Sequence, residues 1–218
     1  MAERILVTGA SGQLGHEVTA RLVQQGCEVI APVREEMDFL DPGQVADVAS
    51  TAQADWVVNC AAYTQVDRAE SEPGQAQLIN CDSAGRLAEA VAGYGGRMLH
   101  VSTDFVFDGT ASRPYREDDA PNPLSVYGRS KRDAELAVGA ALPQAIILRT
   151  AWVYGVHGNN FVKTMLRLAA EREQLRVVSD QVGTPTWARD IARAISELIS
   201  HDARGVFHFT AAGETSWT

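Results

Sequence analysis

Two kinds of hydrophobic pattern alternate along the chain, and together they predict its fold class. Short continuous apolar runs predict buried strands, and they cover residues 3–7, 27–33, 37–41, 55–63, 97–102, 145–153, 175–178 and 206–209. Longer runs with apolar residues every three or four positions predict helices, and they cover residues 16–25, 44–53, 76–94, 125–136, 159–172 and 188–200. Strands that alternate with helices predict an α/β fold, here a Rossmann-type doubly wound parallel sheet.

The pattern changes after residue 154, where a basic amphipathic helix and a turn-rich segment follow. We therefore predict an NAD(P)-binding Rossmann domain over residues 1–154 and a smaller, partial substrate-binding portion over 155–218. Four basic residues are candidates to meet an anionic substrate, although most are expected to be solvated charges. These are Arg149, Lys163, Arg167 and Arg176.

Composition narrows the function classes. A chain of 218 residues that is 45% hydrophobic and 22% charged is typical of a globular protein, and its net charge of −9 argues against a nucleic-acid partner. No apolar run reaches the length of a membrane span, and a strand follows the short polar start, so we expect no signal peptide, no membrane partner and a cytoplasmic location. Cys27, Cys60 and Cys81 lack metal-ligand or redox spacing, and no metal site is assigned.

The segment TGASGQLG joins the first strand to the first helix and carries Gly9, Gly12 and Gly15 at three-residue spacing. Such a turn lets the backbone approach a pyrophosphate, which then meets the N-terminus of the helix. Gly9, Gly12, Gln13, Leu14 and Gly15 are thus candidate cofactor contacts. The alternative is that the glycines only let strand and helix pack closely.

The end of the second strand bears on the choice of cofactor. It has no acidic residue to bind a ribose 2′-hydroxyl, whereas Arg34 is placed to face a 2′-phosphate, which favours NADPH and leaves NADH open. A plain surface arginine is the alternative. Asp38 and Phe39 are expected near the adenine ring. Ala61, Ala62 and Tyr63 end a buried strand with small residues and are further candidate cofactor contacts.

Tyr127 and Lys131 lie four positions apart in a predicted helix and so share one face. A nearby ammonium favours the phenolate, so we expect a lowered pKa for Tyr127 and a role as general acid. Thr103, at the end of another strand, is the candidate hydroxyl that completes the set. A solvated helix face and a turn-capping threonine are the alternatives. The turn-rich segment 105–123 is predicted to form a loop over the site.

Motifs along nearly the whole chain resemble one family. They are TGASGQLG, VVNCAAYTQVDRAE, HVSTDFVFDGT, PNPLSVYGRSK, LRTAWVYG, NNFVKTMLRLA and DQVGTPTW. On these motifs the chain is similar to the dTDP-4-dehydrorhamnose reductases, which belong to the extended short-chain dehydrogenase/reductases. The resemblance implies that Tyr127 donates a proton, that Lys131 assists it and holds the nicotinamide ribose, and that Thr103 tunes both. It also implies cofactor contacts from Gly12 to Gly15 and at Asp38, Phe39 and Ala61 to Tyr63, and it places Thr103, Asp104 and Trp152 near the sugar nucleotide.

The function implied is reduction of the C4 keto group of dTDP-4-dehydro-L-rhamnose to dTDP-L-rhamnose, with a homodimer left open. The family continues beyond the segment GETSWT, so we expect a substrate pocket open on one side, and C-terminal metal or dimer contacts are not carried over. An epimerase or dehydratase of the same superfamily and a non-catalytic NADP-binding regulatory subunit remain alternatives. No glutamate neighbours Thr103-Asp104-Phe105, which favours a simple reductase over a dehydratase.

Overall fold

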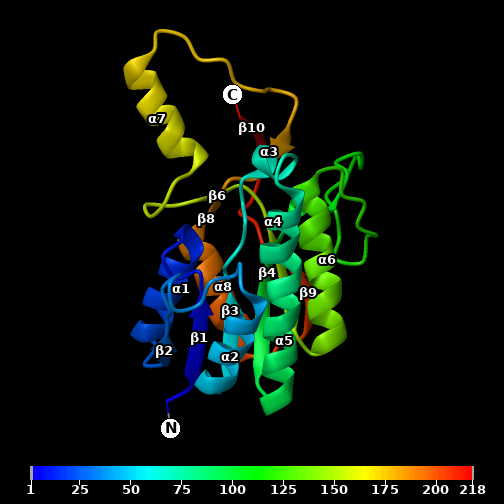
Figure 1. The fold of residues 1–218 in the computed structure, drawn as a ribbon. Coiled ribbons are helices and arrows are strands. Elements are labelled where there is room, and N and C mark those ends of the chain that lie inside the picture. The colour runs from blue at the N-terminus through cyan, green and yellow to red at the C-terminus, as the bar shows by residue number, and fades with distance from the viewer. Residues whose placement is uncertain (1, 218) are drawn as a thin grey trace.

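A six-stranded parallel sheet forms the centre of the computed structural model, which describes residues 2–217. Its strands are β1 (Arg4–Thr8), β2 (Glu28–Ile30), β3 (Trp56–Asn59), β4 (Arg97–Thr103), β5 (Ile146–Thr150) and β9 (Gly205–His208). They lie in the order β2-β1-β3-β4-β5-β9 (Figure 1). The order reverses at β1, which is where a doubly wound sheet binds its ligand at the carboxyl ends of the strands. The predicted fold class is confirmed.

Helices cover both faces of this sheet. One face carries α1 (Gln13–Gln24) and α8 (Ala188–Ser200), and the other carries α2 (Pro42–Ala52), α5 (Ser83–Tyr94) and α6 (Val126–Ala141). The reason lies in the strands, whose side chains alternate between the two faces. In β4, Leu99 packs with α8 whereas Met98 packs with α5 and α6.

The helical segment that leads into α5 differs from the prediction of one helix over 76–94. It consists of α4 (Pro73–Gln77), a π-helical turn η1 (Leu78–Asp82) and then α5, preceded by the single turn α3 (Val66–Ala69). A π turn inserts one extra residue and rotates the side chains that follow it. It therefore sets the direction of Asn80, which faces the site described below.

Two predicted strands are wrong, and β2 is shorter than expected. Residues 37–41 form turns, because Asp38 accepts from the amide of Leu40 and Asp41 caps α2 by accepting from the amides of Gly43 and Gln44. Residues 175–178 form no regular element. Strand β2 ends at Ile30, three residues before the predicted end.

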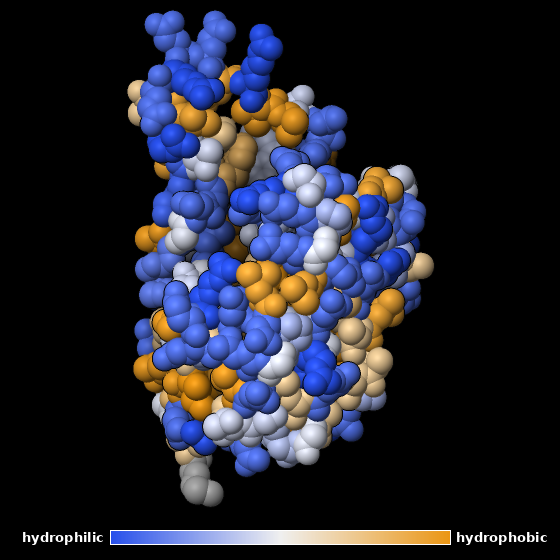
Figure 2. Space-filling model, in the orientation of Figure 1, coloured by the Kyte–Doolittle hydropathy of each residue, from blue (hydrophilic) through white to orange (hydrophobic). Residues whose placement is uncertain are grey.

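A smaller group of elements extends beyond the carboxyl ends of the strands. It contains β6 (Val153–Tyr154) paired with β8 (Thr186–Trp187), β7 (Val182–Gly183) paired with β10 (Thr215–Ser216), and α7 (Phe161–Glu171). Helix α7 buries none of its residues and stands clear of the sheet in Figure 1. Figure 2 shows hydrophobic residues there among strongly hydrophilic ones.

The predicted division at residue 154 remains a prediction, but it does not follow the sheet. Helix α8 and strand β9 lie beyond 154 and return to the main sheet, where Ile191 and Ile195 are fully buried. Among residues 155–217, and at β6 just before them, the segments around β6, α7, β7, β8 and β10 lie outside the main sheet. Within residues 2–217, no helix is long and apolar enough to cross a membrane.

Candidate active site

The turn between β1 and α1 is built as the glycine spacing predicts. Gly9 has φ +65°, and a Cβ there would lie 2.7 Å from the amide nitrogen of Ala61. A Cβ on Gly15 would collide with the carbonyl oxygen of Gly9. The N-cap of α1 is Gly12, so no side chain caps the first turn. The first amides of α1, at Gln13 and Leu14, are thus open to an anion, and the turn fits a dinucleotide pyrophosphate.

The other predicted cofactor contacts fall into two groups. Ala61, Ala62 and Tyr63 follow β3 beside the glycine turn and are half-buried, which suits a ligand-facing wall. Arg34 is exposed, with its Nε 3.6 Å from Asp38 Oδ1. Phe39 differs, because its side chain is buried in the core cluster under α2 and α5. A contact between Phe39 and the adenine stays a prediction.

Tyr127 lies in the first turn of α6, close to Thr103. Ser125 caps this helix by accepting from the amide of Gly128, and the ring of Phe105 meets the Tyr127 ring edge-on at 5.6 Å. The Thr103 hydroxyl lies near the Tyr127 phenol and acts on it in the direction that lowers its pKa. Thr103 also donates to Asp104 Oδ1 at 3.0 Å. The structure therefore brings together three of the predicted residues, Thr103, Asp104 and Tyr127.

The electrostatics of Tyr127 differ from the prediction. Burial raises the pKa of Tyr127 to about 12, opposed by the Thr103 hydroxyl and reinforced by the nearby Asp104. The expected lowering by Lys131 is wrong for this structure, because the Lys131 ammonium is not among the groups that shift the phenol. A phenol with a raised pKa is protonated at neutral pH, which is the state that a proton donor requires. Burial likewise raises the pKa of Asp104.

Lys131 points into the protein, toward β4. It is 2% exposed, and its Nζ lies 2.7 Å from the carbonyl oxygen of Val101 and 3.1 Å from His100 Nε2. Burial lowers the pKa of Lys131 to about 8, and the Glu135 carboxylate opposes this shift. Lys131 thus changes charge within the pH range in which an enzyme works.

Behind Lys131 lies a buried ion pair that the sequence did not indicate. Glu135 accepts from Arg149 Nη2 at 2.7 Å, from Arg149 Nε at 2.9 Å and from Ser102 Oγ at 2.5 Å. Arg149 Nη1 lies 3.3 Å from His208 Nε2. The expectation that Arg149 meets an anionic substrate is wrong, because its side chain is only 6% exposed and bound by Glu135. Glu135 follows Lys131 by one helical turn, a spacing that would have singled it out.

Asn80 is a second residue whose role the sequence did not reveal. From the π turn its side chain accepts from the amide of Tyr63 at 2.8 Å and donates to the Tyr63 carbonyl at 3.1 Å. It also donates to Ser130 Oγ, which in turn donates to the Tyr127 carbonyl. Asn80 therefore joins the predicted cofactor wall at Tyr63 to the helix that carries Tyr127 and Lys131.

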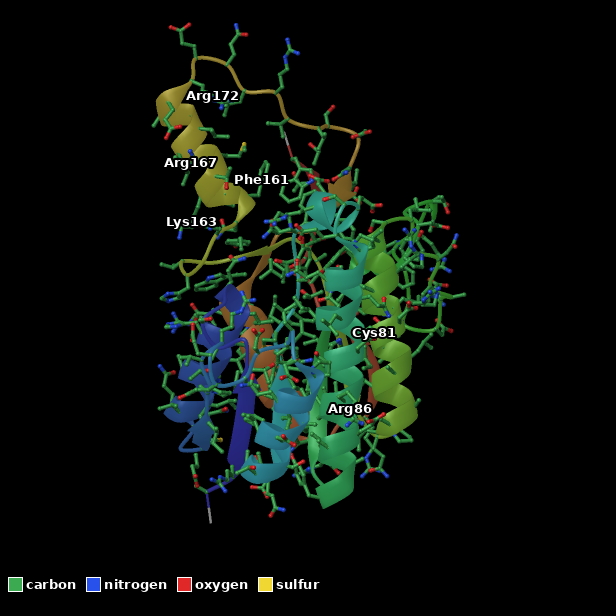
Figure 3. The ribbon with its side chains drawn as sticks, in the orientation of Figure 1. Cys81, Arg86, Phe161, Lys163, Arg167 and Arg172 are labelled. Atoms are coloured by element: carbon green, nitrogen blue, oxygen red, sulfur yellow. The ribbon has the colours of Figure 1, made fainter. Side chains whose placement is uncertain are left out.

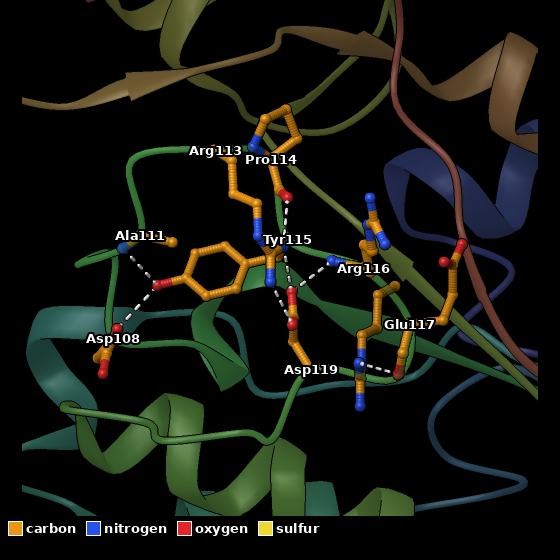
Figure 4. Close-up of polar contacts among 9 residues, drawn as sticks. Asp108, Ala111, Arg113, Pro114, Tyr115, Arg116, Glu117 and Asp119 are labelled. Atoms are coloured by element: carbon orange, nitrogen blue, oxygen red, sulfur yellow. Dashed lines mark hydrogen bonds and ion pairs between the residues drawn. The ribbon is translucent and has the colours of Figure 1, made fainter.

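The predicted loop 105–123 begins at the site and then runs beside β5 and β9. Figure 4 shows its inner bonds, in which Arg113 pairs with Asp119 and the Tyr115 hydroxyl donates to Asp108. The carboxylate of Glu117 accepts from the amide of His208 in β9. The loop is thus fastened to the far edge of the sheet, while Phe105 at its start packs against Tyr127.

Trp152 lines a separate apolar cavity of about 300 Å³ beyond the strand ends. Its backbone has φ +46°, and its ring stacks on Trp217 with centroids 3.6 Å apart. Phe161 of α7 closes another side. A Cβ on Gly183 would collide with the Trp152 ring, so only glycine allows this packing.

The remaining basic candidates lie outside this cavity. Figure 3 places Lys163 and Arg167 on α7. Lys163 Nζ donates to the carbonyls of Val156 and Gly158, and Arg167 forms an exposed ion pair with Glu171. Arg176 is exposed.

Comparisons with known proteins agree on one family. The family model described as "RmlD substrate binding domain" matches residues 3–218. The chain is 45% identical to a dTDP-4-dehydrorhamnose reductase of Burkholderia thailandensis, over 98% of this chain and 74% of that protein. It is 44% identical to a dTDP-4-keto-6-deoxy-D-glucose reductase of Streptomyces niveus, over 100% of this chain and 76% of that protein.

A solved structure points to the same family as these relatives. The crystal structure of dTDP-4-dehydrorhamnose reductase from Bacillus anthracis in complex with NADP superposes with a TM-score of 0.95 at 38% identity. The match covers 100% of this chain and 77% of that chain.

Proposed function

This chain belongs to the RmlD substrate-binding-domain family, and we propose that it is an oxidoreductase that uses NADPH to reduce the C4 keto group of dTDP-4-dehydro-L-rhamnose. The product is dTDP-L-rhamnose, and NADH is the alternative reductant. One observation supports this reaction above the others. The Thr103 hydroxyl lies beside the protonated Tyr127 phenol, and buried contacts run from the glycine turn to Lys131.

Two surfaces of the chain fit the cofactor. The amides at the start of α1, between Gly12 and Gly15, would hold the pyrophosphate, and Arg34 would face the 2′-phosphate. Ala61 to Tyr63 would flank the dinucleotide. Bound NADPH supplies the hydride that adds to the carbonyl carbon of the sugar.

The residues of the chain handle the proton and the orientation. Tyr127 donates its phenolic proton to the C4 oxygen as negative charge develops there, and Thr103 holds the same oxygen by a hydrogen bond. Lys131, when charged, stabilises the phenolate that is left and binds the nicotinamide ribose. Asp104 and Trp152 contact the sugar nucleotide. Acid catalysis by a positioned group is typically worth about a hundredfold to ten-thousandfold.

The direct test mixes the protein with NADPH, and separately NADH, and an enzymatically prepared dTDP-4-dehydro-L-rhamnose. We expect loss of absorbance at the reduced nicotinamide band that depends on the sugar, and dTDP-L-rhamnose as product. Isomerised or dehydrated sugar with no net consumption of NADPH would instead identify an epimerase or dehydratase. Tight NADPH binding with no turnover would identify a regulatory binding module.

The name of one relative gives a second candidate substrate. The Streptomyces niveus protein is named for the reduction of dTDP-4-keto-6-deoxy-D-glucose. Both sugars present a C4 ketone to the same proton donor, so the assay includes both. The ratio of the two kcat/KM values decides between them. A cytoplasmic location and a homodimer are also proposed, and size-exclusion chromatography with light scattering tests the latter.

A further inference from the structure

A buried chain of hydrogen bonds lies under the glycine turn and ends at Lys131. Thr8, Asn59 and His100 occupy facing positions on β1, β3 and β4 and are at most 1% exposed. Thr8 Oγ1 donates to Asn59 Oδ1 at 2.6 Å, and Asn59 Nδ2 lies 3.0 Å from His100 Nδ1. His100 Nε2 lies 3.1 Å from Lys131 Nζ.

One main-chain amide fixes the direction of this chain. The amide of Ala61 donates to Asn59 Oδ1 at 3.1 Å and to Thr8 Oγ1 at 3.3 Å. Reversing the Asn59 side chain would set its NH₂ group against the Ala61 N–H. The oxygen of Asn59 therefore faces Ala61 and its nitrogen faces His100. Since an amide nitrogen donates only, His100 Nδ1 must accept.

The tautomer of His100 follows from this contact. Burial lowers the pKa of His100 well below its ordinary value, so the ring is neutral. A neutral imidazole that accepts at Nδ1 carries its hydrogen on Nε2. That hydrogen points at Lys131 Nζ. An ammonium has three donors and no acceptor, so only the neutral amine of Lys131 can complete the bond.

We propose that His100 is a positioning residue that, at alkaline pH in the free protein, donates its Nε2–H to the neutral amine of Lys131 and holds that side chain turned away from Tyr127. This proposal deepens the proposed function. Its consequence for turnover rests on the proposed function, whereas the role of His100 in the free protein does not. When the amine of Lys131 takes up a proton from solvent, its nitrogen has no lone pair left and can no longer accept from His100. Its Nζ can then turn from His100 toward the Tyr127 phenol and the cofactor ribose, where a positive charge is useful.

Two groups around Lys131 favour its charged form, namely the Val101 carbonyl, which accepts from Nζ at 2.7 Å, and the Glu135 carboxylate. Cys60, after β3, is an uncharged thiol because burial raises its pKa to about 12. Tyr127, on the same helix, is a neutral phenol. Glu135 favours the ammonium, but its charge is shared with Arg149. Burial favours the amine, and the hydrogen of His100 acts in the same direction.

The first test is the tautomer of His100 in the free protein, which does not depend on any catalytic activity. Long-range ¹H–¹⁵N spectra at pH 8.5 would report each of the five histidines. We expect one ring that does not titrate down to pH 6, with hydrogen on Nε2 and none on Nδ1. Loss of that signal in His100→Phe assigns it. A ring with its hydrogen on Nδ1 overturns the proposal.

The second test is the alkaline limb of the kcat profile. His100→Phe removes a donor to the amine, so the pKa of Lys131 and the limb should rise by about one pH unit, which is the worth of one hydrogen bond. If His100 instead accepted from an ammonium, the limb would fall, and the proposal would fail.

A variant that keeps the ring guards against a misfolded His100→Phe. Asn59→Asp preserves the oxygen that faces Ala61 and adds an acceptor that faces His100. We expect the hydrogen to move to Nδ1 in the spectra and the alkaline limb to rise. An unchanged tautomer in Asn59→Asp overturns the proposal. Absence of turnover in the unaltered protein would count against the proposed function alone, because the spectra of the free protein still decide the role of His100.

Discussion

Glu135→Gln tests whether breaking the buried ion pair between Glu135 and Arg149 lowers the free energy of unfolding as much as leaving a charge buried without a partner should. In the structure the carboxylate accepts twice from Arg149 and once from Ser102. An amide has one accepting oxygen, so either of its orientations sets an N–H against a guanidinium N–H of Arg149. One charge-assisted hydrogen bond is lost, worth about 1.5–3 kcal/mol, and the guanidinium stays buried without a counter-charge. Breaking a buried pair in this way typically costs about 3–5 kcal/mol.

The measurement is the free energy of unfolding, from urea titrations followed by circular dichroism at pH 7. The matched control is Glu171→Gln, because Glu171 forms the same kind of pair with Arg167 on α7 but both side chains are more than half exposed (53% and 63%). We expect the control to cost less than about 0.5 kcal/mol. Arg149→Met should cost less in the Glu135→Gln background than alone, since it then removes an unpaired charge.

Equal costs for Glu135→Gln and Glu171→Gln would refute the reasoning. The substitution also has a predicted effect on turnover. The Glu135 carboxylate raises the pKa of Lys131, so its removal should lower that pKa below about 8. The ammonium is then lost at a lower pH, and the alkaline limb of the kcat profile should move down.

Three further substitutions test the site. Tyr127→Phe should lower kcat by about a hundredfold to ten-thousandfold with NADPH affinity unchanged by fluorescence titration, whereas Tyr94→Phe, which removes a buried hydroxyl that has no hydrogen-bond partner within the described chain, should leave kcat unaltered. Gly15→Ala should abolish measurable NADPH binding, because its Cβ meets the carbonyl of Gly9, whereas Gly139→Ala on α6 meets nothing and should bind normally. Arg34→Ala should weaken NADPH binding by about tenfold to a hundredfold and leave NADH binding unchanged, and equal effects on both cofactors would contradict a contact with the 2′-phosphate.

The sequence was sufficient where a local pattern has one structural outcome. The span of α8 matches its predicted range of 188–200, because its apolar stripe has a clear period and packs, together with α1, on one face of the sheet. The glycine turn was predictable for a similar reason, since a tight turn with a close strand contact admits no other residue at Gly9 and Gly15.

Local patterns gave wrong elements where side chains bind backbone amides that a strand would use, and where a helical period hides a change of helix type. The apolar residues of 37–41 suggested a strand, but Asp38 and Asp41 accept from nearby amides and hold turns instead. The segment 76–94 kept helical periodicity throughout, and nothing in it marked the π turn that directs Asn80. The lowered pKa expected for Tyr127 failed because spacing along a helix does not tell where a long side chain turns. Lys131 shares the helical face of Tyr127, yet its Nζ bonds with β4.

A single sequence does not reveal the register between neighbouring strands. The site depends on that register, because it decides which polar residues of different strands lie side by side. Thr8, Asn59 and His100 each look like an isolated polar residue in or at the end of an apolar strand, but the register places them side by side across β1, β3 and β4. Two residues further along β4, a second polar row forms in the same way. Ser102 faces Arg149, and Arg149 faces His208 of β9.

Helix α6 contacts both rows, because Lys131 bonds with the first row and Glu135, one helical turn later, bonds with the second. The two rows have opposite effects on Lys131. The first ends in a histidine hydrogen that favours the amine, and the second ends in a carboxylate that favours the ammonium. A change in either row should therefore move the same alkaline limb, upward for His100→Phe and downward for Glu135→Gln. The double variant should return it toward its original position, and a double variant that keeps either full shift would show that the two rows do not act on one group.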